Sequence, residues 1–533
     1  MLAADGRPLK ASLNRALRRQ KLRALMLIAP LLIFILITFI IPIGQMLFRS
    51  VENQIVGDTI PRTVDAVADW DADTGNAPDK TVFRALAMDL MIAVEEKKHT
   101  RLGSRLNYET SGISSLFRKS GRRVDDIGEV YADQFIALDE AWEEPATWVT
   151  LMADPDWIAE QAAWDGEGIE PAFVVGEQAR DALPQTAAIY ADFAATIRDV
   201  DGDSPSEEEP WNIVYLALHE DLTANPQVEI DGPLVGLVSN AAREAQSFER
   251  EDVRAAFEDI DDDWLDVEVW QTIQTYSPAF TSGYFLNAVD LQKSPDGPVW
   301  QPENERIYLT LFWRTLVMSL TITLACVLLG YPVAWMLANL PARKANLLMI
   351  LVLLPFWTSL LVRTSAWKVL LQQQGVINDT LVWIGLVADD NRLALINNAT
   401  GTIIAMTHIL LPFMILPLYS VMKTIPPSYL RAAKSLGATN WTAFWRVYFP
   451  QSVPGIGAGC ILVFILAIGY YITPEIVGGT RGVFISNRIA YHISTSLNWG
   501  LAAALGAILL AVVLILYWAY DRIVGIDNVK LGG

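Results

Sequence analysis

The sequence predicts an all-α polytopic membrane protein with six transmembrane helices and a large, mainly helical extracytoplasmic insert between helices 1 and 2. Two observations carry this prediction. Apolar residues make up 52% of the 533 residues, more than in a typical soluble domain. The formal charge of −20 is unevenly distributed, because residues 51–300 hold 51 Asp and Glu against 17 Lys and Arg, whereas the remainder has a net charge of +14. Two different solvents therefore surround the two parts of the chain.

The first predicted span covers residues 24–48 and follows a basic N-terminus, residues 1–23. This run of 25 residues carries no charge, and as a helix it is about 37 Å long, enough to cross a hydrocarbon core of about 30 Å. The run is too long for the apolar part of a signal peptide, and no small-residue cleavage pattern follows it. We therefore expect a retained transmembrane helix.

Five further apolar runs follow a long polar stretch, and they complete the six predicted spans. If the N-terminus is cytoplasmic, most Lys and Arg outside 51–300 fall on the cytoplasmic face, as the positive-inside rule requires. We therefore expect cytoplasmic termini, including the tail 525–533, and an extracytoplasmic segment 49–308. The runs lie near 312–338, 345–366, 400–422, 456–477 and 498–520.

The acidic insert, residues 49–308, is expected to fold rather than to stay disordered. It carries nine tryptophans between Trp70 and Trp300, and stretches such as KTVFRALAMDLMIAVEEKK show helical periodicity. Alternating aspartates, for example Asp199, Asp201 and Asp203, suggest calcium ligands, but the glycine and glutamate of an EF-hand loop are missing. Solvated acidic loops are the interpretation we adopt there.

The segment 425–455 between the fourth and fifth spans predicts two short amphipathic helices around a glycine. Pro426 and Pro427 should end the fourth span, and Ser428 can cap the first short helix. Gly437 is suited to the position after a helix end, and Thr439 or Asn440 can start the second helix. The side chains that define the two helical faces are Leu430, Ala433 and Leu436, and then Trp441, Phe444, Trp445 and Tyr448.

Pro450 and Pro454 are expected to break the second helix before the fifth span. From these residues alone, the segment is either a hairpin lying along the membrane interface or an elbow that projects into the cytoplasm. Physical reasoning leaves both interpretations open.

The string AAKSLGATNWTAFWRVYFPQSVPGI resembles the EAA loop of ABC-importer permeases. The strings SLTITLACVLLGYPVAWMLA, LLPFWTSLLVRTSAWKVLLQQQGVIN and ITPEIVGG resemble the permease subunits of spermidine/putrescine-type importers. The resemblance covers the first span and residues 309–524, a permease core with helices 2–6, and it leaves out the insert. It implies that segment 425–455 is a cytoplasmic coupling loop that docks on an ATPase subunit, with docking residues Arg431, Ala432, Ala433, Gly437 and Ala438. Arg431 stands where the family usually has glutamate.

The resemblance also implies partners and a location. They are an ATP-binding subunit, a second permease subunit, an extracytoplasmic substrate-binding protein and the lipid bilayer of the bacterial inner membrane, with no nucleic acid. We expect no enzymatic activity, metal or cofactor on this chain, since it lacks the G-x-x-x-x-G-K-[ST] phosphate loop. ATP would be bound and hydrolysed by the partner subunit.

Ionisable and aromatic residues near the spans are candidates for the substrate path, because burying charge in a membrane is costly. Each has a second interpretation: His408 as a hydrogen-bonded core residue, the charged residues as interfacial anchors or ion-pair partners, and the aromatic residues as part of an aromatic belt. The candidates are Trp357, Arg363, His408, Tyr470 and Glu475.

The expected function is that of a permease passing a small organic solute, polyamine-like by resemblance, with opines and amino-acid-like compounds as alternatives. A membrane receptor or sensor is a second class, but it needs a cytoplasmic output domain, and only DRIVGIDNVKLGG follows the sixth span. A secondary transporter would be expected to show repeated halves and interrupted helices, and no repeat is seen between spans one to three and four to six.

Overall fold

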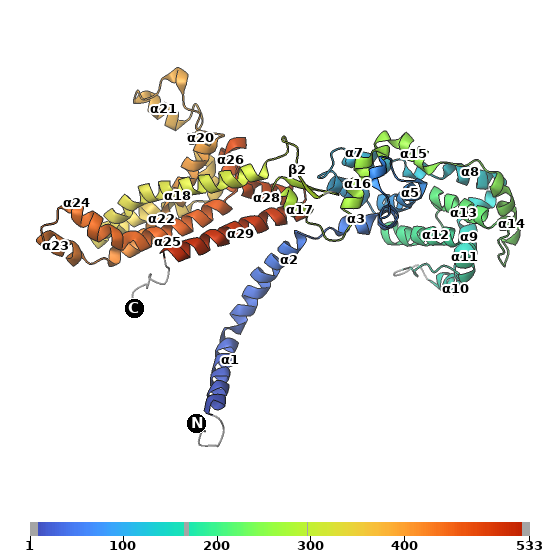
Figure 1. The fold of residues 1–533 in the computed structure, drawn as a ribbon, viewed down its shortest axis with the longest axis horizontal. Helices are drawn as coiled ribbons and strands as arrows, with labels where there is room; N and C mark the ends of the chain where they lie inside the picture. The colour runs from blue at the N-terminus through green and yellow to red at the C-terminus, as the bar shows by residue number, and fades with distance from the viewer. Residues whose placement is uncertain (1–8, 165–169, 296, 525–533) are drawn as a thin grey trace. The chain divides into compact units, whose positions relative to one another are not determined.

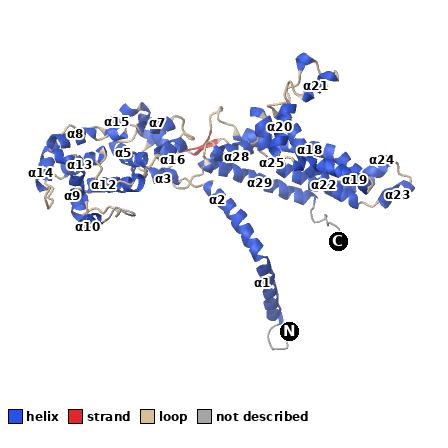
Figure 2. Cartoon of the chain, turned by 180° about the vertical axis from the view of Figure 1, so that it is seen from behind, coloured by secondary structure: helices blue, strands red, loops and turns tan. Residues whose placement is uncertain are grey.

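The computed structural model describes residues 9–164, 170–295 and 297–524, and it divides into two compact units. The first unit contains the N-terminal segment as far as Val51, residues 282–292 and the chain from Pro298 onward, and the second contains residues 52–281 and 293–297. Helices make up most of both units (Figure 1, Figure 2). A two-stranded sheet pairs β1 (Leu291–Ser294) with β2 (Gly297–Trp300).

Within the described residues, five helical segments of the first unit are long and apolar enough to cross a membrane, and a bent pair would make a sixth. The prediction of a mainly helical, multi-span membrane protein is therefore confirmed, whereas the count of six spans stays a prediction. The five are the continuous α1 (Leu9–Ile35), η1 (Leu36–Ile40) and α2 (Ile41–Arg49), then α18 (Tyr308–Asn339), α22 (Ala399–Thr424), Asn440–Gly469 and α29 (Trp499–Val524).

The apolar run predicted as one span over 345–366 is bent by 94°. α19 (Ala342–Leu353) ends in the 3₁₀ turn η8 (Leu354–Trp357), and α20 (Leu360–Leu370) starts again after it. Pro355 lacks the N–H that would continue the helix, and the Ser359 side chain caps α20 by accepting the N–H of Val362 at 3.2 Å. The run 456–477 is also divided, since α25 (Phe449–Gly469) ends before α26 (Ile472–Val477) begins.

The core of the first unit lies where α18, α22 and α25 pack together. At Gly459 of α25, a Cβ atom would lie 2.5 Å from the Sδ atom of Met414 on α22, so the two helices approach at a distance that a side chain would prevent. The remaining elements of this unit are α17 (Gly283–Asn287), α21 (Val376–Trp383), η9 (Asp389–Asn391), α23 (Pro427–Ser435), α24 (Asn440–Ala443), η10 (Phe444–Tyr448), α27 (Gly479–Gly482) and α28 (Ile485–Ser494).

The second unit is the acidic insert, and its expected helical character is confirmed. Five tryptophans lie in its core almost without solvent exposure: Trp142, Trp148, Trp157, Trp264 and Trp270. Its elements are α3 (Gln54–Thr59), α4 (Pro61–Val67), η2 (Ala72–Thr74), α5 (Lys80–Glu95), α6 (His99–Leu106), α7 (Ile113–Ser120), η3 (Val124–Asp126), α8 (Glu129–Leu138), η4 (Glu140–Trp142), α9 (Pro145–Met152), α10 (Pro155–Ala163), α11 (Glu177–Ala182), α12 (Pro184–Thr196), η5 (Ile197–Asp201), α13 (Asn212–Ala224), α14 (Val235–Glu244), η6 (Ala245–Ser247), α15 (Val253–Ile260), η7 (Asp262–Leu265) and α16 (Val267–Thr275).

One contact occurs twice in the insert at the start of a helix. The backbone N–H and the hydroxyl of Thr63 both donate to Oδ2 of Asp89, at 2.7 and 2.8 Å, and those of Thr186 donate in the same way to Asp221, both at 2.8 Å. Each threonine follows a proline by two positions, in the sequences PRT and PQT. The same pair of buried hydrogen bonds therefore joins α4 to α5 and α12 to α13.

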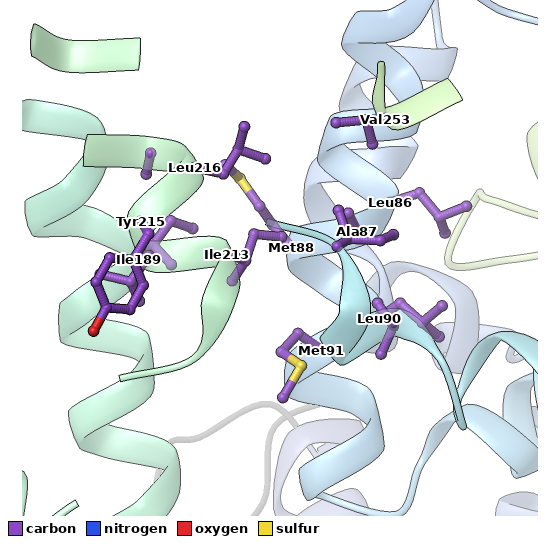
Figure 3. Close-up of a cluster of buried hydrophobic side chains, with 14 of the residues drawn as sticks. Leu86, Ala87, Met88, Leu90, Met91, Ile189, Ile213, Tyr215, Leu216 and Val253 are labelled. Carbon is purple, nitrogen blue, oxygen red and sulfur yellow. The ribbon is translucent and has the colours of Figure 1, made fainter. Parts of the chain in front are cut away.

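A second contact also occurs twice, around paired tryptophans with the spacing D-x-x-W-x₅-W. The indole N–H of Trp148 donates to the carbonyl of Trp142 at 2.8 Å, and that of Trp270 donates to the carbonyl of Trp264 at 2.7 Å. Together with the two Thr–Asp contacts, this indicates an internal repeat in the insert. Figure 3 shows the buried cluster in which side chains of α5 and α13, such as Met88 and Leu216, lie together.

The two ends of the insert are held side by side. Glu52 and Phe280 form an antiparallel bridge, and the backbone N–H of Asn53 donates to the carbonyl of Ala279 at 2.8 Å. The Asn53 side chain also donates to the carbonyl of Tyr276 at 2.5 Å. The main segment of this unit, residues 52–281, therefore begins and ends at one place.

Candidate functional site

The segment between the fourth and fifth predicted spans bends at Gly437, whose φ angle is +89°. Its N–H donates to the carbonyl of Lys434, and the N–H of Ala438 donates to the carbonyl of Ala433, both at 3.0 Å. These two bonds form a Schellman motif, which ends a helix with a left-handed residue and favours glycine there. The predicted helix end at Gly437 is confirmed.

The second helix of the elbow begins at Thr439, one of the two residues predicted to start it. The hydroxyl oxygen of Thr439 accepts the N–H of Thr442 at 3.2 Å and caps α24. In Figure 1, α23 and α24 lie at one end of the bundle formed by α18, α22, α25 and α29, and α28 lies at the other end. We call the segment α23–α24 the elbow from here on.

The aromatic residues after the bend divide into an anchoring pair and an exposed pair. Phe444 contacts Tyr331 of α18, with ring centroids 6.2 Å apart, and Tyr448 is buried. Trp441 is 72% exposed and lies against the exposed Trp445, with ring centroids 5.5 Å apart. Leu436, next to the bend, is 89% exposed. The elbow thus presents large apolar side chains away from its own bundle.

Two of the predicted helix boundaries in this region are wrong. Ser428 does not cap α23, because Pro426 and Pro427 occupy the N-cap and first helical positions and Ser428 lies inside the helix. The helix is not broken at Pro450 or Pro454, since α24 continues through the π turn η10 into α25. A proline removes one backbone hydrogen bond, and neighbouring helices in a packed bundle can support the helix around it.

The five predicted docking residues lie together around the bend but differ in exposure. Arg431, Ala432 and Gly437 are exposed, whereas Ala433 and Ala438 are partly buried where the Schellman motif joins them. The two partly buried alanines therefore hold the shape of the elbow, and the exposed residues form its surface.

The predicted substrate-path residues separate into different places. Arg363 lies on α20, His408 lies on α22, and Tyr470 directly follows α25. His408 accepts a hydrogen bond from the indole N–H of Trp367 at 3.1 Å. Trp357 lies on η8 with 73% of its surface exposed, and Glu475 lies on α26. The bond between Trp367 and His408 joins α20, the helix of Arg363, to α22.

Arg363 has an unusual environment within this group. Its Nε and Nη1 atoms are buried and meet no hydrogen-bond acceptor among the described residues. The next residue, Thr364, hydrogen-bonds through its hydroxyl to Thr473 of α26 at 3.1 Å. A buried donor without an acceptor costs free energy, so an acceptor for these two atoms would stabilise the arrangement.

Glu475 contributes to a cavity of about 450 Å³ at the end of the bundle that carries α28. Its Oε2 atom accepts a hydrogen bond from the side chain of Asn487 at 2.6 Å. The cavity is lined by Arg306, Ile307, Thr310, Leu311, Arg314, Glu475, Gly479, Thr480, Val483, Asn487, Arg488 and Tyr491. Of the three arginines, Arg306 precedes α18, Arg314 lies on α18 and Arg488 lies on α28.

These arginines were not among the residues predicted from the sequence. Arg488 stands out in the sequence only as a basic residue that opposes the positive-inside pattern, and Arg306 and Arg314 only flank the second span. An excess of arginine at the predicted outer ends of spans is the signal that points to them.

Comparisons with known proteins place the permease part of the chain in a family. Residues 306–524 match the family described as binding-protein-dependent transport system inner membrane component. The spermidine/putrescine transport system permease protein PotB of Escherichia coli (strain K12) is 36% identical over 220 residues, covering 41% of this chain and 79% of that protein. The inner membrane ABC transporter permease protein YdcU of Escherichia coli (strain K12) is 34% identical over 240 residues, covering 43% of this chain and 74% of that protein.

A third relative is the PotB protein of Haemophilus influenzae, 36% identical over 220 residues and 76% of its length. Among solved structures, a bacterial alginate ABC transporter in complex with its alginate-bound periplasmic protein aligns with a TM-score of 0.34 and 19% identity, over 42% of this chain and 81% of that one. The family match begins at residue 306, after the insert. The chain belongs to the binding-protein-dependent inner membrane transport components, and it is a multi-pass permease subunit of the ABC-importer type.

Proposed function

We propose that this chain forms part of the path by which a small organic solute, polyamine-like in class, crosses the bacterial inner membrane, and that the elbow couples this movement to a separate ATP-binding subunit. The PotB relatives, which are named as spermidine/putrescine transport permeases, support the solute class. An opine or amino-acid-like solute is the alternative of the same type.

One observation carries the coupling role of the elbow. Leu436 and Trp441 are 89% and 72% exposed on either side of a bend that is fixed by two backbone hydrogen bonds. Large apolar side chains grouped on an exposed, rigid projection are typical of a protein-binding surface. We propose that the elbow docks into a groove of the ATP-binding subunit. Arg431 and Ala432 would lie at the rim of this contact.

The remaining parts of the proposal concern partners and orientation. An importer of this type requires an ATP-binding subunit, a second permease subunit and a substrate-binding protein, and the unpartnered donors of Arg363 are consistent with a further chain or a solute at that face. The Lys and Arg distribution supports cytoplasmic termini, a cytoplasmic elbow and an extracytoplasmic insert. Arg363, His408 and Tyr470 would lie along the solute path.

The test is a photo-reactive amino acid placed at Leu436 in the assembled complex. We expect it to cross-link to the ATP-binding subunit. A matched probe at Trp383, which is 86% exposed on α21 and extracytoplasmic in the proposed topology, should not. A cross-link from position 383 but not from 436 would contradict the coupling role.

A further inference from the structure

The cavity beside α26 brings together the guanidinium groups of Arg306, Arg314 and Arg488. Arg306 donates through Nε to the carbonyl of Gln301 at 2.6 Å, and Arg314 donates through Nη1 to the carbonyl of Thr480 at 2.9 Å. Arg488 lies over the ring of Tyr491, 5.7 Å from its centroid. Among the described residues, none of the three forms an ion pair. Because a guanidinium has five N–H donors, most of their donors remain available.

The same cavity also contains one carboxylate. Glu475 is exposed, and one of its oxygens is held by Asn487. The lining therefore has three positive charges and one negative charge, set among the apolar side chains of Ile307, Leu311 and Val483. Charged and polar side chains therefore dominate the lining, and the volume of about 450 Å³ is within the usual size range of a small-molecule site.

We propose that this cavity binds a small solute that carries a carboxylate beside an ammonium group. The carboxylate would be received by Arg314 and Arg488, since a guanidinium pairs with a carboxylate through two parallel hydrogen bonds. The ammonium would face Glu475, and the hydrocarbon part would lie against the apolar wall. This inference rests on the proposed transport role, and within it favours the amino-acid-like alternative over a polyamine.

Other ligands match the lining less well. A polyamine without a carboxylate would bring several positive charges toward three unpaired guanidinium groups. A phosphate would find the arginines but would also face the carboxylate of Glu475, and like charges repel. A solute with charges of both signs satisfies both parts of the lining.

The experiment uses the complete permease–ATPase complex in lipid nanodiscs, without the substrate-binding protein, so that binding reports on the permease itself. The probes are ornithine and putrescine, which differ by one carboxylate, and pentanoate, which has the carboxylate but no amine. Binding is measured by saturation-transfer NMR titration. We expect ornithine to bind most tightly, pentanoate less tightly and putrescine least.

The variants Arg314→Gln and Arg488→Gln should each weaken ornithine binding about tenfold, the effect of a lost charge-assisted hydrogen bond. Glu475→Gln should weaken ornithine binding but not pentanoate binding. Arg481→Gln is the matched control, because Arg481 is exposed on α27 and does not line the cavity. Arg488→Gln keeps the test valid if Arg314→Gln disturbs the bond to Thr480.

Three results would overturn the inference: putrescine binding as tightly as ornithine, unchanged ornithine binding in Arg488→Gln, or displacement of ornithine by inorganic phosphate more readily than by pentanoate. Each variant is also checked for co-purification of the ATP-binding subunit. If the ATP-binding subunit does not co-purify with the unmodified chain, the proposed function is contradicted. An assembled complex that fails to bind ornithine would contradict this inference alone.

Discussion

The ring of Phe83 meets the indole of Trp270 edge-on, with centroids 4.9 Å apart and planes at 70°. Tyr215 and Trp148 repeat this arrangement, with centroids 5.0 Å apart and planes at 81°. Phe83 belongs to the first half of the insert and Trp270 to the second, whereas Tyr215 belongs to the second half and Trp148 to the first. Each half therefore completes the core of the other.

Trp270→Ala should destabilise the whole insert. The indole is fully buried and hydrogen-bonded to Trp264, and removal of a buried tryptophan costs about 3–5 kcal/mol. Trp148→Ala should cost a similar amount and expose both halves together. Pulse proteolysis of the full-length chain in detergent measures this loss. Trp300→Ala is the control, since Trp300 is 58% exposed, and its change should stay within about 0.5 kcal/mol. Selective opening of one half would show that the halves fold separately.

Substitution of Gly437 should uncouple transport from ATP hydrolysis in a graded way. A Cβ atom at this position would meet nothing within 4 Å, so the effect comes from the positive φ angle alone. Left-handed backbone costs most residues about 1–2 kcal/mol and asparagine less. We expect solute-stimulated ATPase activity in the reconstituted complex to fall in the order Gly, Asn, Ala, Val.

The matched control for this series is Gly202→Ala in the insert, where φ is +78° and the space is also open. This substitution introduces the same kind of backbone strain in the insert, outside the elbow. It should leave solute-stimulated ATPase activity unchanged. If the complexes with Gly, Asn, Ala and Val at position 437 show equal solute-stimulated ATPase activity, the role of the bend is contradicted.

The insert should lose stability as the pH falls below about 6.5. Burial lowers the pKa of His219, whose Nε2 atom contacts the carbonyl of Ala245 at 3.1 Å and whose ring stacks on Tyr131, with Arg250 acting in the same direction. The unfolded chain, with a histidine pKa near 6.5, binds the proton more readily. The free energy of unfolding therefore falls from that pH down to the lower pKa of the folded state.

Hydrogen exchange at α13, corrected for the intrinsic effect of pH, measures this change in the full-length chain. His219→Gln should flatten the dependence between about pH 5.5 and 6.5, above the range in which ordinary carboxyl groups titrate. If His219→Gln shows the same dependence of stability on pH as the unmodified chain, groups other than His219 cause the loss of stability.

The proposed topology predicts which residues are accessible from outside the cell. In a background without Cys326 and Cys460, which are the chain's two cysteines, a cysteine at Asp201 should react with an impermeant reagent. A cysteine at Ser435 in the elbow should react only after the membrane is permeabilised. Labelling in the opposite pattern would invert the orientation.

Local signals in the sequence predict the elements that depend on local physics. Gly437 is predictable because few other residues accept a left-handed bend, and Thr439 because a hydroxyl can cap a helix. The apolar runs mark the membrane helices for the same reason. Periodicity does not reveal the 94° break after η8, since Leu354, Phe356 and Trp357 are as apolar in a turn as in a helix.

Contacts between distant segments are the part that the sequence did not yield. The pairing of Phe83 with Trp270 depends on how the halves fold together, and no local pattern encodes it. The arginines of the cavity are separated in the same way, because α18 and α28 meet only in the folded chain. The repeated PRT and PQT segments and the D-x-x-W-x₅-W spacing were visible, but they have meaning only once the bonds they form are known.

The bridge between Glu52 and Phe280 makes the insert a domain that can be placed in an existing loop at little cost. Because its first and last residues are already neighbours, a turn between two helices can receive the whole domain without being stretched or redirected. The family match starts at residue 306, so the insert lies outside the matched residues. Such a domain can change in sequence, or acquire a task of its own, while the helices that carry the solute keep their geometry.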